Sequence, residues 1–539
     1  MVVPELRPWR AARPHVARFA GAVRPRLART AAAVRPRLAR LRPSRPAGAG
    51  TATGSRITRL AAWPGAWRFT VVAATAGTVL AAGAVTAAGP WDSTGQRTAE
   101  QDRAVALEAT RGTDHGGRGN AGTPPRGPRT APSAPSVLTG LGGGATTVKS
   151  APGGKALTGA LAPLLKSPAL GDLSASVVDV STGRSVYGDD TGDALTPAST
   201  TKIATAVAVL TALGPDHRLT TRATFEPDTK EVILVGGGDP TLTAREKNPT
   251  GSASLRDLAG RTAAALAERG VREVTLSYDT TLYPGGQRHP IGVNPNLAAL
   301  TPLMADEARR DDSAAGPADR VADPAADAAR KFGALLKEYG IKATPPGPSK
   351  STTRAGALAA VSSPPLATLV ERMLTHSDND LAEALARQTA IATGGRADFA
   401  GASAAVRAQL QKLGVPLKGA VFKDGSGLDR GNRLTAGLLT ALLVKSGDPA
   451  RPELRPVLTG LPVAGFTGTL AGRYADGAAG VVRAKTGTLT GVNALAGTVV
   501  DREGRLLAFA FLATGTTDPT AAQAALDKAA TALAACGCR

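Results

Sequence analysis

The chain has 539 residues, enough for two or three domains that each bury a core, so its size does not exclude an enzyme. The formal net charge is +21, but the basic excess lies mainly between Arg7 and Arg68, with no lysine there and Glu5 as the only acid nearby. Aromatic residues make up only 3% of the chain and do not alternate with these arginines. The stacking surface of a nucleic-acid binder is therefore missing, and we expect no nucleic-acid partner.

Histidine and cysteine are scarce and poorly placed for metal binding. The five histidines are scattered without the spacing of metal ligands, so we predict no metal site and no cofactor. The two cysteines, Cys536 and Cys538, are too few for a disulfide framework, and their role stays open.

Residues 1–68 contain a repeat, AVRPRLAR, at Ala22 to Arg29 and again at Ala33 to Arg40. Prolines interrupt any long helix here, and the charge run is typical of a solvated segment. We predict a basic, disordered cytoplasmic tail that lies near anionic lipid, with binding to a partner protein as the alternative.

Residues 69–89, FTVVAATAGTVLAAGAVTAAG, carry no charge and are long enough for a helix that crosses a membrane. Arginines precede this segment, and Asp92 and Glu100 follow it, so the positive-inside rule places the N-terminus in the cytoplasm and the rest outside. A cleaved signal peptide is the alternative, since Ala82, Ala84 and Ala87 are small residues suited to a processing site. Residues 90–155, rich in Gly, Pro, Thr and Ser, read as a flexible linker.

Patterned sequence begins near Ala156 with a short helix, ALTGALAPLL, and a hairpin, ASVVDVSTGRSVYG. Near the C-terminus, GVVRAKTG, NALAGTVV and LLAFAFLA read as three strands, with a polar turn from Asp501 to Arg505, and a helix is predicted from Pro519 to Ala535. These elements predict an α/β fold of the α+β type, with one antiparallel sheet assembled from both ends of the chain and flanked by helices.

An inserted domain is predicted at 217–361, which leaves 156–216 and 362–539 to form together the domain that it interrupts. The inserted segment holds strand-like EVILVGGG and REVTLSYD around the helical run LRDLAGRTAAALAERG. Its Pro-Ala-Asp-rich part, from Ser313 to Asp327, reads as a loop. The function of the insertion cannot be inferred from sequence.

The first chemical motif is Ser199-Thr200-Thr201-Lys202, which opens the helix-patterned run KIATAVAVLTAL. Residues three apart share a helix face, so the Lys202 amine can reach the Ser199 hydroxyl. A serine hydroxyl needs a base to become a nucleophile, and Lys202 serves if burial keeps it neutral. Taken alone, however, a serine at a helix start is most often a cap, and a lysine there is most often a surface residue.

Two further motifs change that balance. Ser377-Asp378-Asn379 lies between two helical runs, and Lys485-Thr486-Gly487 lies on a predicted strand. The ordered trio S-x-x-K, S-D-N and K-T-G is the signature of class A β-lactamases and penicillin-binding proteins.

Two other glycine-rich runs do not complete a known motif. GGGDP at Gly236 lacks the Lys-Ser/Thr pair of a P-loop, and Gly425-Ser426-Gly427 lacks the spacing of a nucleophile elbow. Both are predicted to be tight turns.

From about Ala156 to its end, the chain resembles the D-alanyl-D-alanine carboxypeptidase/endopeptidase group of low-molecular-mass class C penicillin-binding proteins. Four more runs carry the resemblance: GGGDPTL, HSDNDLAEAL, DGSGLDRGNRLT and GTLAGR. The resemblance implies the penicillin-binding serine transpeptidase-like fold, an insertion between the first two motifs, peptidoglycan stem peptides as substrates and β-lactams as inhibitors.

The resemblance also implies a role for each motif residue. Ser199 attacks the carbonyl between two terminal D-alanines, Lys202 accepts its proton, and Ser377 relays a proton to the leaving amine. The N–H groups of Ser199 and Thr488 bind the oxyanion. The substrate is bound by Asn379, Lys485, Thr486 and Gly487.

Two other functions remain open at this stage. A β-lactamase needs a carboxylate that activates water, and no E-x-x-x-N-like segment stands out between Ser377 and Lys485, so we expect stable acylation by penicillins. A non-catalytic wall-binding or regulatory protein would keep the fold with little turnover. The intact Ser199, Lys202, Ser377 and Lys485 argue against it.

Overall fold

The computed structural model describes residues 154–537, except 249 and 475–476. The predicted tail (1–68), the predicted membrane segment (69–89) and nearly all of the predicted linker (90–155) lie outside these residues. Within the described part, no helix is long and apolar enough to cross a membrane.

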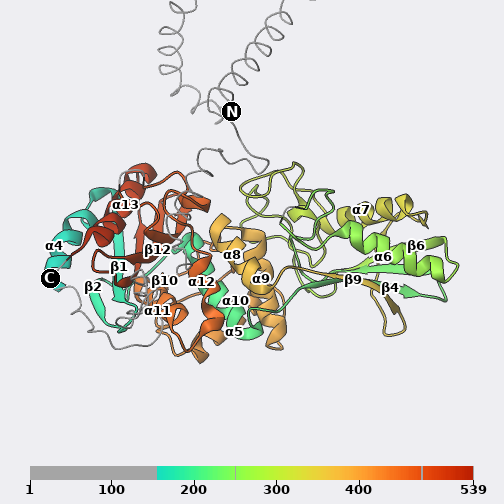
Figure 1. Cartoon of the computed structure of the whole chain (residues 1–539), viewed down its shortest axis with the longest axis horizontal. Coiled ribbons are helices and arrows are strands. Elements are labelled where there is room, and N and C mark those ends of the chain that lie inside the picture. The colour runs from blue at the N-terminus through green and yellow to red at the C-terminus, as the bar shows by residue number, and fades with distance from the viewer. Residues whose placement is uncertain (1–153, 249, 475–476, 538–539) are drawn as a thin grey trace, which may run out of the picture. The chain divides into compact units, whose positions relative to one another are not determined.

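A five-stranded sheet joins the two ends of the described chain, as the sequence predicts (Figure 1). Its strand order is β11-β12-β13-β1-β2, and all neighbouring pairs are antiparallel. The strands are β1 (Asp172–Asp179), β2 (Ser185–Asp189), β11 (Val482–Leu489), β12 (Val492–Val500) and β13 (Leu506–Thr514). The predicted hairpin, the three late strands and the turn between Val500 and Leu506 are confirmed.

Helices cover both faces of this sheet, which explains why β13 is apolar from Leu506 to Ala513 rather than at alternate positions. Phe509 and Phe511 pack on one face against α4 (Gly154–Leu165) and α13 (Pro519–Ala535). Ala508, Ala510 and Leu512 face the other side, where α11 (Ala436–Gly447) packs. Because side chains alternate along a strand, the Ala/Phe alternation puts bulky residues on one face and lets a helix approach closely on the other.

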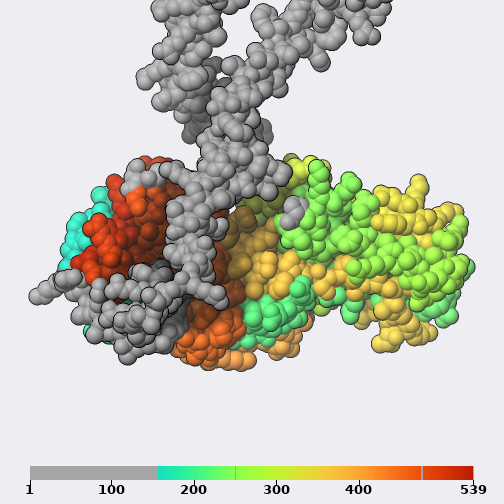
Figure 2. Space-filling view, viewed as in Figure 1, coloured from blue at the N-terminus to red at the C-terminus, as the bar shows by residue number. Residues whose placement is uncertain are grey.

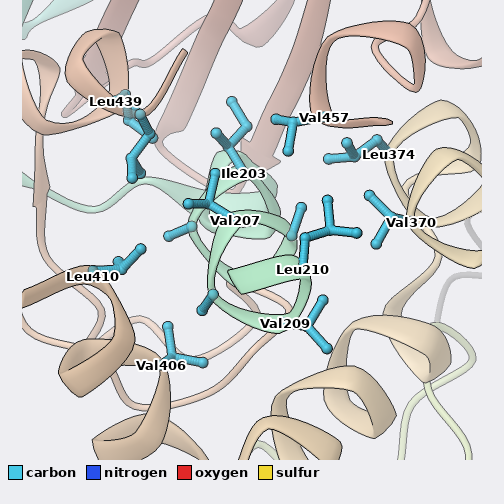
Figure 3. Close-up of a cluster of buried hydrophobic side chains, with 14 of the residues drawn as sticks. Ile203, Val207, Val209, Leu210, Val370, Leu374, Val406, Leu410, Leu439 and Val457 are labelled. Carbon is cyan, nitrogen blue, oxygen red and sulfur yellow. The ribbon is translucent and has the colours of Figure 1, made fainter. Parts of the chain in front are cut away.

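The helix α5 (Thr201–Leu213) lies at the centre of a helical core (Figure 3). It is apolar around most of its circumference, the pattern of a fully buried helix. Side chains from α8 (Leu366–His376), α10 (Phe399–Lys412), α11 and α12 (Pro456–Thr459) pack around Ile203, Val207 and Leu210. The start of α5, which carries the first motif, is therefore held by packing on several sides.

Between α5 and α8 the chain builds a second, mixed sheet with its own core (Figure 1). Its order is β7-β6-β5-β4-β9, with β8 beside β6; β5 and β6 are parallel, while β4 is antiparallel to both neighbours. The strands are β4 (Thr220–Glu226), β5 (Glu231–Val235), β6 (Glu273–Asp279), β7 (Lys342–Ala343), β8 (Gly347–Pro348) and β9 (Gly356–Ser362). In Figure 2 this green and yellow part lies beside the helical core. The domain bounds given above stay a prediction.

Two helices, α6 (Leu255–Glu268) and α7 (Pro324–Glu338), pack against the second sheet. The predicted loop from Ser313 to Asp327 is wrong at its end, because α7 begins at Pro324. The Asp323 side chain accepts a hydrogen bond from Ala326 N at 3.0 Å, and a proline at the first helical position leaves no N–H unpaired. This N-cap signal outweighs the proline-rich composition.

Candidate active site

Ser199 lies on a 3-10 turn, Ala198–Thr200, directly before α5, rather than inside the first turn of the helix as predicted. Ala198 adopts a left-handed backbone with φ of 46°, an unusual conformation for a residue other than glycine. The regular helix can begin only after that residue. Such local strain is typical of functional sites, and here it projects Ser199 into a cavity.

Lys202 contacts Ser199 as the sequence predicts. Its Nζ lies 3.1 Å from Ser199 Oγ, 2.6 Å from Asn379 Oδ1 and 2.7 Å from the carbonyl oxygen of Ser426. A neutral amine has two N–H bonds and one lone pair. When Asn379 and Ser426 accept the two N–H bonds, the lone pair is left for the third neighbour, the Ser199 hydroxyl.

Burial lowers the pKa of Lys202 to about 8, although the carboxylates of Asp424, Glu383, Asp378 and Asp380 act in the opposite direction. The desolvation of a fully buried ammonium group is the larger effect. A base with this pKa is partly neutral near neutral pH, which is what proton abstraction from a hydroxyl requires.

Ser377 and Asn379 lie at the junction of α8 and α9 (Asn379–Ala392). Ser377 ends α8 in a left-handed conformation, with φ of 57°, and Asp378 caps α9 by accepting a hydrogen bond from Leu381 N at 3.0 Å. Arg372 pairs with Asp378 at 3.3 Å and fixes this turn from the α8 side. The junction directs Ser377 and Asn379 into the same cavity as Ser199.

Lys485, Thr486, Gly487 and Thr488 lie on β11, at an edge of the five-stranded sheet. Lys485 is not an exposed edge lysine, because it is fully buried and donates to the carbonyl oxygen of Thr486 at 2.8 Å. Burial and the nearby positive charges of Lys202 and Arg473 lower the pKa of Lys485 well below its usual value. Thr486 and Thr488, in contrast, line the cavity.

Two glycines let the motif segments approach one another. A Cβ at Gly487 would lie 2.6 Å from the carbonyl oxygen of Pro197, so glycine lets β11 pack directly against the turn that carries Ser199. Gly427 has φ of 86°, and a Cβ there would overlap the carbonyl oxygen of Ala198. The same Ser199 turn is thus enclosed by β11 and by the loop 424–427, which is the tight turn predicted from sequence.

The cavity has a volume of about 410 Å3. Five of the residues that the sequence predicts for the site line it: Ser199, Ser377, Asn379, Thr486 and Thr488. Lys202, Lys485 and Gly487 do not line it, because they lie behind its wall as supporting residues. Several further polar residues line the cavity and were not predicted: Asn296, Arg309, Arg320, Thr469, Arg473 and Gln523.

Thr469 and Arg473 belong to the GTLAGR run, which was recognised in the sequence without a role being assigned. Arg473 forms a bidentate ion pair with Asp527 of α13 and also faces the cavity. Thr469 Oγ1 lies 3.0 Å from Thr486 Oγ1. For Asn296, Arg309 and Arg320, all in the inserted segment, no sequence pattern indicated a place in this cavity.

The sequence is similar to those of known carboxypeptidases. A model of the D-Ala-D-Ala carboxypeptidase 3 (S13) family matches residues 157–295 and 310–535. The chain is 37% identical over 402 residues to carboxypeptidase DacB of Mycolicibacterium smegmatis, covering 71% of this chain and 85% of that one. It is 35% identical over 432 residues to a carboxypeptidase of Mycobacterium tuberculosis, covering 77% and 91%.

The fold also has a counterpart among solved structures. Penicillin binding protein 4 (dacB) from Haemophilus influenzae superimposes with a TM-score of 0.56 at 21% identity, covering 70% of this chain and 97% of that one. A second crystal structure of that protein holds a β-lactam.

Proposed function

The chain belongs to the D-Ala-D-Ala carboxypeptidase 3 (S13) family and is a serine-type carboxypeptidase, and on this premise we propose that Ser199 is its nucleophile and Lys202 its general base. The observation that carries the proposal is the 3.1 Å contact between Lys202 Nζ and Ser199 Oγ at the wall of a 410 Å3 cavity. The substrates are peptidoglycan stem peptides that end in D-alanyl-D-alanine.

In the acylation step, Ser199 Oγ attacks the carbonyl carbon between the two D-alanines while Lys202 Nζ takes the hydroxyl proton. The oxyanion that forms is bound by the N–H groups of Ser199 and Thr488. The C–N bond then breaks, and Ser377 relays the proton from Lys202 to the departing amine of the last D-alanine, which leaves Lys202 neutral for the next step. Water attacks the resulting ester, which releases the shortened peptide and returns the proton to the serine.

The substrate is bound on both sides of Ser199. We assign Asn379 to the peptide amide of the substrate and Thr486 to its terminal carboxylate. The amine of Lys485 is buried behind the cavity wall, where burial disfavours its charge; a bound carboxylate nearby favours the protonated amine, which then attracts it. Gly487 acts by letting β11 close against Ser199. Arg473 adds a second positive charge on the cavity side.

A β-lactam presents a strained amide to the same nucleophile, so we propose that β-lactams acylate Ser199. The ester should persist, since no E-x-x-x-N-like segment, the kind that supplies a water-activating carboxylate, lies between Ser377 and Lys485. This expectation separates the carboxypeptidase from a β-lactamase.

The experiment compares the full-length chain with Ser199→Ala, using a fluorescent penicillin and a pentapeptide ending in D-alanyl-D-alanine. The wild type should retain the label and release D-alanine, and Ser199→Ala should do neither. Ser349→Ala, which changes a serine of the second sheet region away from the cavity, serves as the matched control. Rapid loss of label would indicate a β-lactamase, labelling without D-alanine release a non-catalytic binding protein, and absence of labelling would refute the serine mechanism.

We further propose that residues 69–89 anchor the protein in the cell membrane, with residues 1–68 in the cytoplasm and the catalytic residues outside. The support is the uncharged length of the segment and the arginines that precede it. Fractionation of cells that express the full chain, or the chain without 69–89, tests this. Recovery of both chains in the same soluble or secreted fraction, or N-terminal processing after the segment, would contradict an uncleaved anchor.

A further inference from the structure

His289 belongs to the inserted segment between β6 and α7, yet its side chain is buried against Asp424, which lies in the loop that contacts Lys202. Its Nε2 lies 3.0 Å from Asp424 Oδ2 and 4.0 Å from Glu383 Oε1. The Nδ1 atom accepts a hydrogen bond from Ile291 N at 3.3 Å, so the tautomer with its proton on Nε2 satisfies both contacts. The ring packs edge-on against Phe399 of α10, with 5.2 Å between ring centroids.

Asp424, the acceptor of that hydrogen bond, organises the loop that contacts Lys202. Its Oδ1 accepts from Gly427 N at 2.8 Å and from Asn432 Nδ2 at 2.7 Å, and its Oδ2 accepts from Asp429 N at 2.6 Å. Glu383 of α9 holds the same loop by accepting from Ser426 N at 2.8 Å. These contacts fix the Ser426 carbonyl oxygen, which accepts from Lys202 Nζ at 2.7 Å.

The inserted segment also fixes the second acceptor of Lys202. The carbonyl oxygen of Asn296 accepts from Asn379 Nδ2 at 2.9 Å, which turns Asn379 Oδ1 toward Lys202. Both N–H acceptors of the base are therefore oriented, directly or through one further residue, by residues 289–296. Because these acceptors leave the amine lone pair for Ser199, their positions decide whether the lone pair of Lys202 points at the Ser199 hydroxyl.

We propose that His289 is a positioning residue for the acylation step: by donating from Nε2 to Asp424 it holds the Ser426 carbonyl oxygen and so directs Lys202 toward Ser199. The insertion is then a part of the catalytic apparatus rather than an appended domain. This inference rests on the proposed function, in which Lys202 is the base for Ser199.

His289, Glu383 and Asp424 also have the spacing of metal ligands. Their oxygens, however, are committed to hydrogen-bond donors. Glu383 Oε2 accepts from Gly425 N at 3.2 Å, and both oxygens of Asp424 accept from N–H groups. A cation at this point would face several N–H hydrogens, so we interpret the cluster as a hydrogen-bond network.

The charges around Lys202 and His289 predict that loss of His289 raises the pKa of Lys202. Around Lys202 lie the carboxyl groups of Asp424, Glu383, Asp378 and Asp380 and the buried amine of Lys485. Around His289 lie Asp424, Glu383 and Asp429. Burial acts to lower the pKa of His289, but the hydrogen bond to Asp424 and these carboxylates outweigh burial and raise it. By donating a hydrogen bond to Asp424, His289 partly offsets the carboxylates that raise the pKa of Lys202, so losing it should make Lys202 harder to deprotonate.

The test measures the rate of acylation by a chromogenic penicillin against pH for the full-length chain, His289→Gln and His289→Met. Glutamine keeps an N–H donor, whereas methionine fills similar space without one. We expect His289→Gln to stay within a few-fold of the wild type. For His289→Met we expect the midpoint to move upward by about one pH unit, which reduces the rate near neutral pH about tenfold while rates converge at high pH. His217→Ala, a histidine outside this network, is the control.

A purely structural role would lower the labelled fraction or the melting temperature without moving the pH midpoint of acylation, and that result overturns the proposal. Equal behaviour of His289→Gln and His289→Met also overturns it. If His289→Met does not fold, Asp424→Asn replaces it: loss of a carboxylate beside Lys202 should move the midpoint downward, and an unchanged or raised midpoint overturns the proposal. A wild-type chain that is not acylated at all refutes the proposed function instead.

Discussion

The amide oxygen of Asn379 accepts a hydrogen bond from Lys202 Nζ at 2.6 Å, although the two residues are 177 positions apart in sequence. The contact joins the start of α9 to the first turn of α5, where the S-D-N and S-x-x-K motifs end. Asn379 therefore has two roles in the proposed site: it binds the substrate amide through the cavity and orients the base behind it.

The pH dependence of acylation should report the pKa of Lys202. Because Lys202 must be neutral to accept a proton, and its pKa is about 8, the rate with a penicillin should rise with pH through about 8 and level off above it. Lys202→Met should reduce the rate by about 10² to 10⁴-fold and remove this rise. If the rate of Lys202→Met still rises with pH at the same midpoint, the midpoint belongs to another group.

Replacing Asn379 by two different residues should move this midpoint in opposite directions. Asn379→Asp places a carboxylate about 2.6 Å from Lys202 Nζ, which favours the charged amine and raises the midpoint. Asn379→Ala removes an acceptor of the ammonium form and lowers it. Acylation rates between pH 6 and 10 check both, and shifts of the same sign in the two variants would show that the contact does not set the pKa.

Gly487→Ala should destabilise the protein and slow acylation together. The added Cβ would lie 2.6 Å from the Pro197 carbonyl oxygen, and relief of that overlap moves β11, with Thr488, away from Ser199. We expect a loss of about 1–3 kcal/mol, measured by chemical unfolding. Gly159→Ala in α4 meets no atom within 4 Å and should be neutral or stabilising. Full activity of Gly487→Ala would show that this close approach is not needed.

Thr486→Val should weaken recognition of the substrate carboxylate. The side chain keeps its shape but loses the hydroxyl at the cavity wall, and a hydrogen bond to a charged group contributes about 1.5–3 kcal/mol. The ratio of kcat/KM for a pentapeptide with a free carboxylate to that for its C-terminal amide should therefore fall about tenfold or more. Thr229→Val, on an exposed turn, is the control, and an unchanged ratio would place the carboxylate elsewhere.

The elements predicted most accurately are those whose signal is local. The hairpin of β1 and β2, the strands β11 to β13 and the helix α13 are specified by side-chain periodicity and by turn residues such as those between Val500 and Leu506, which act over a few positions. The S-D-N and K-T-G motifs also lie at the predicted junction and on the predicted strand. The predicted start of α5 is two residues too early. Ala198 before it is left-handed, in a turn that packs against β11 and Gly427, which are distant in sequence.

By itself, the sequence determined the order of the motifs, the antiparallel sheet built from both chain ends and the pairing of Ser199 with Lys202. Only the tertiary structure decided that Lys485 lies behind the cavity wall, that Arg473 faces the cavity and that His289 and Asn296 reach the supports of the base. The physical reason is that periodicity and capping are properties of neighbouring residues. Burial and long-range hydrogen bonds depend on how separate elements pack. His289 and Asp424 are 135 positions apart, so no pattern of neighbouring residues indicates their hydrogen bond.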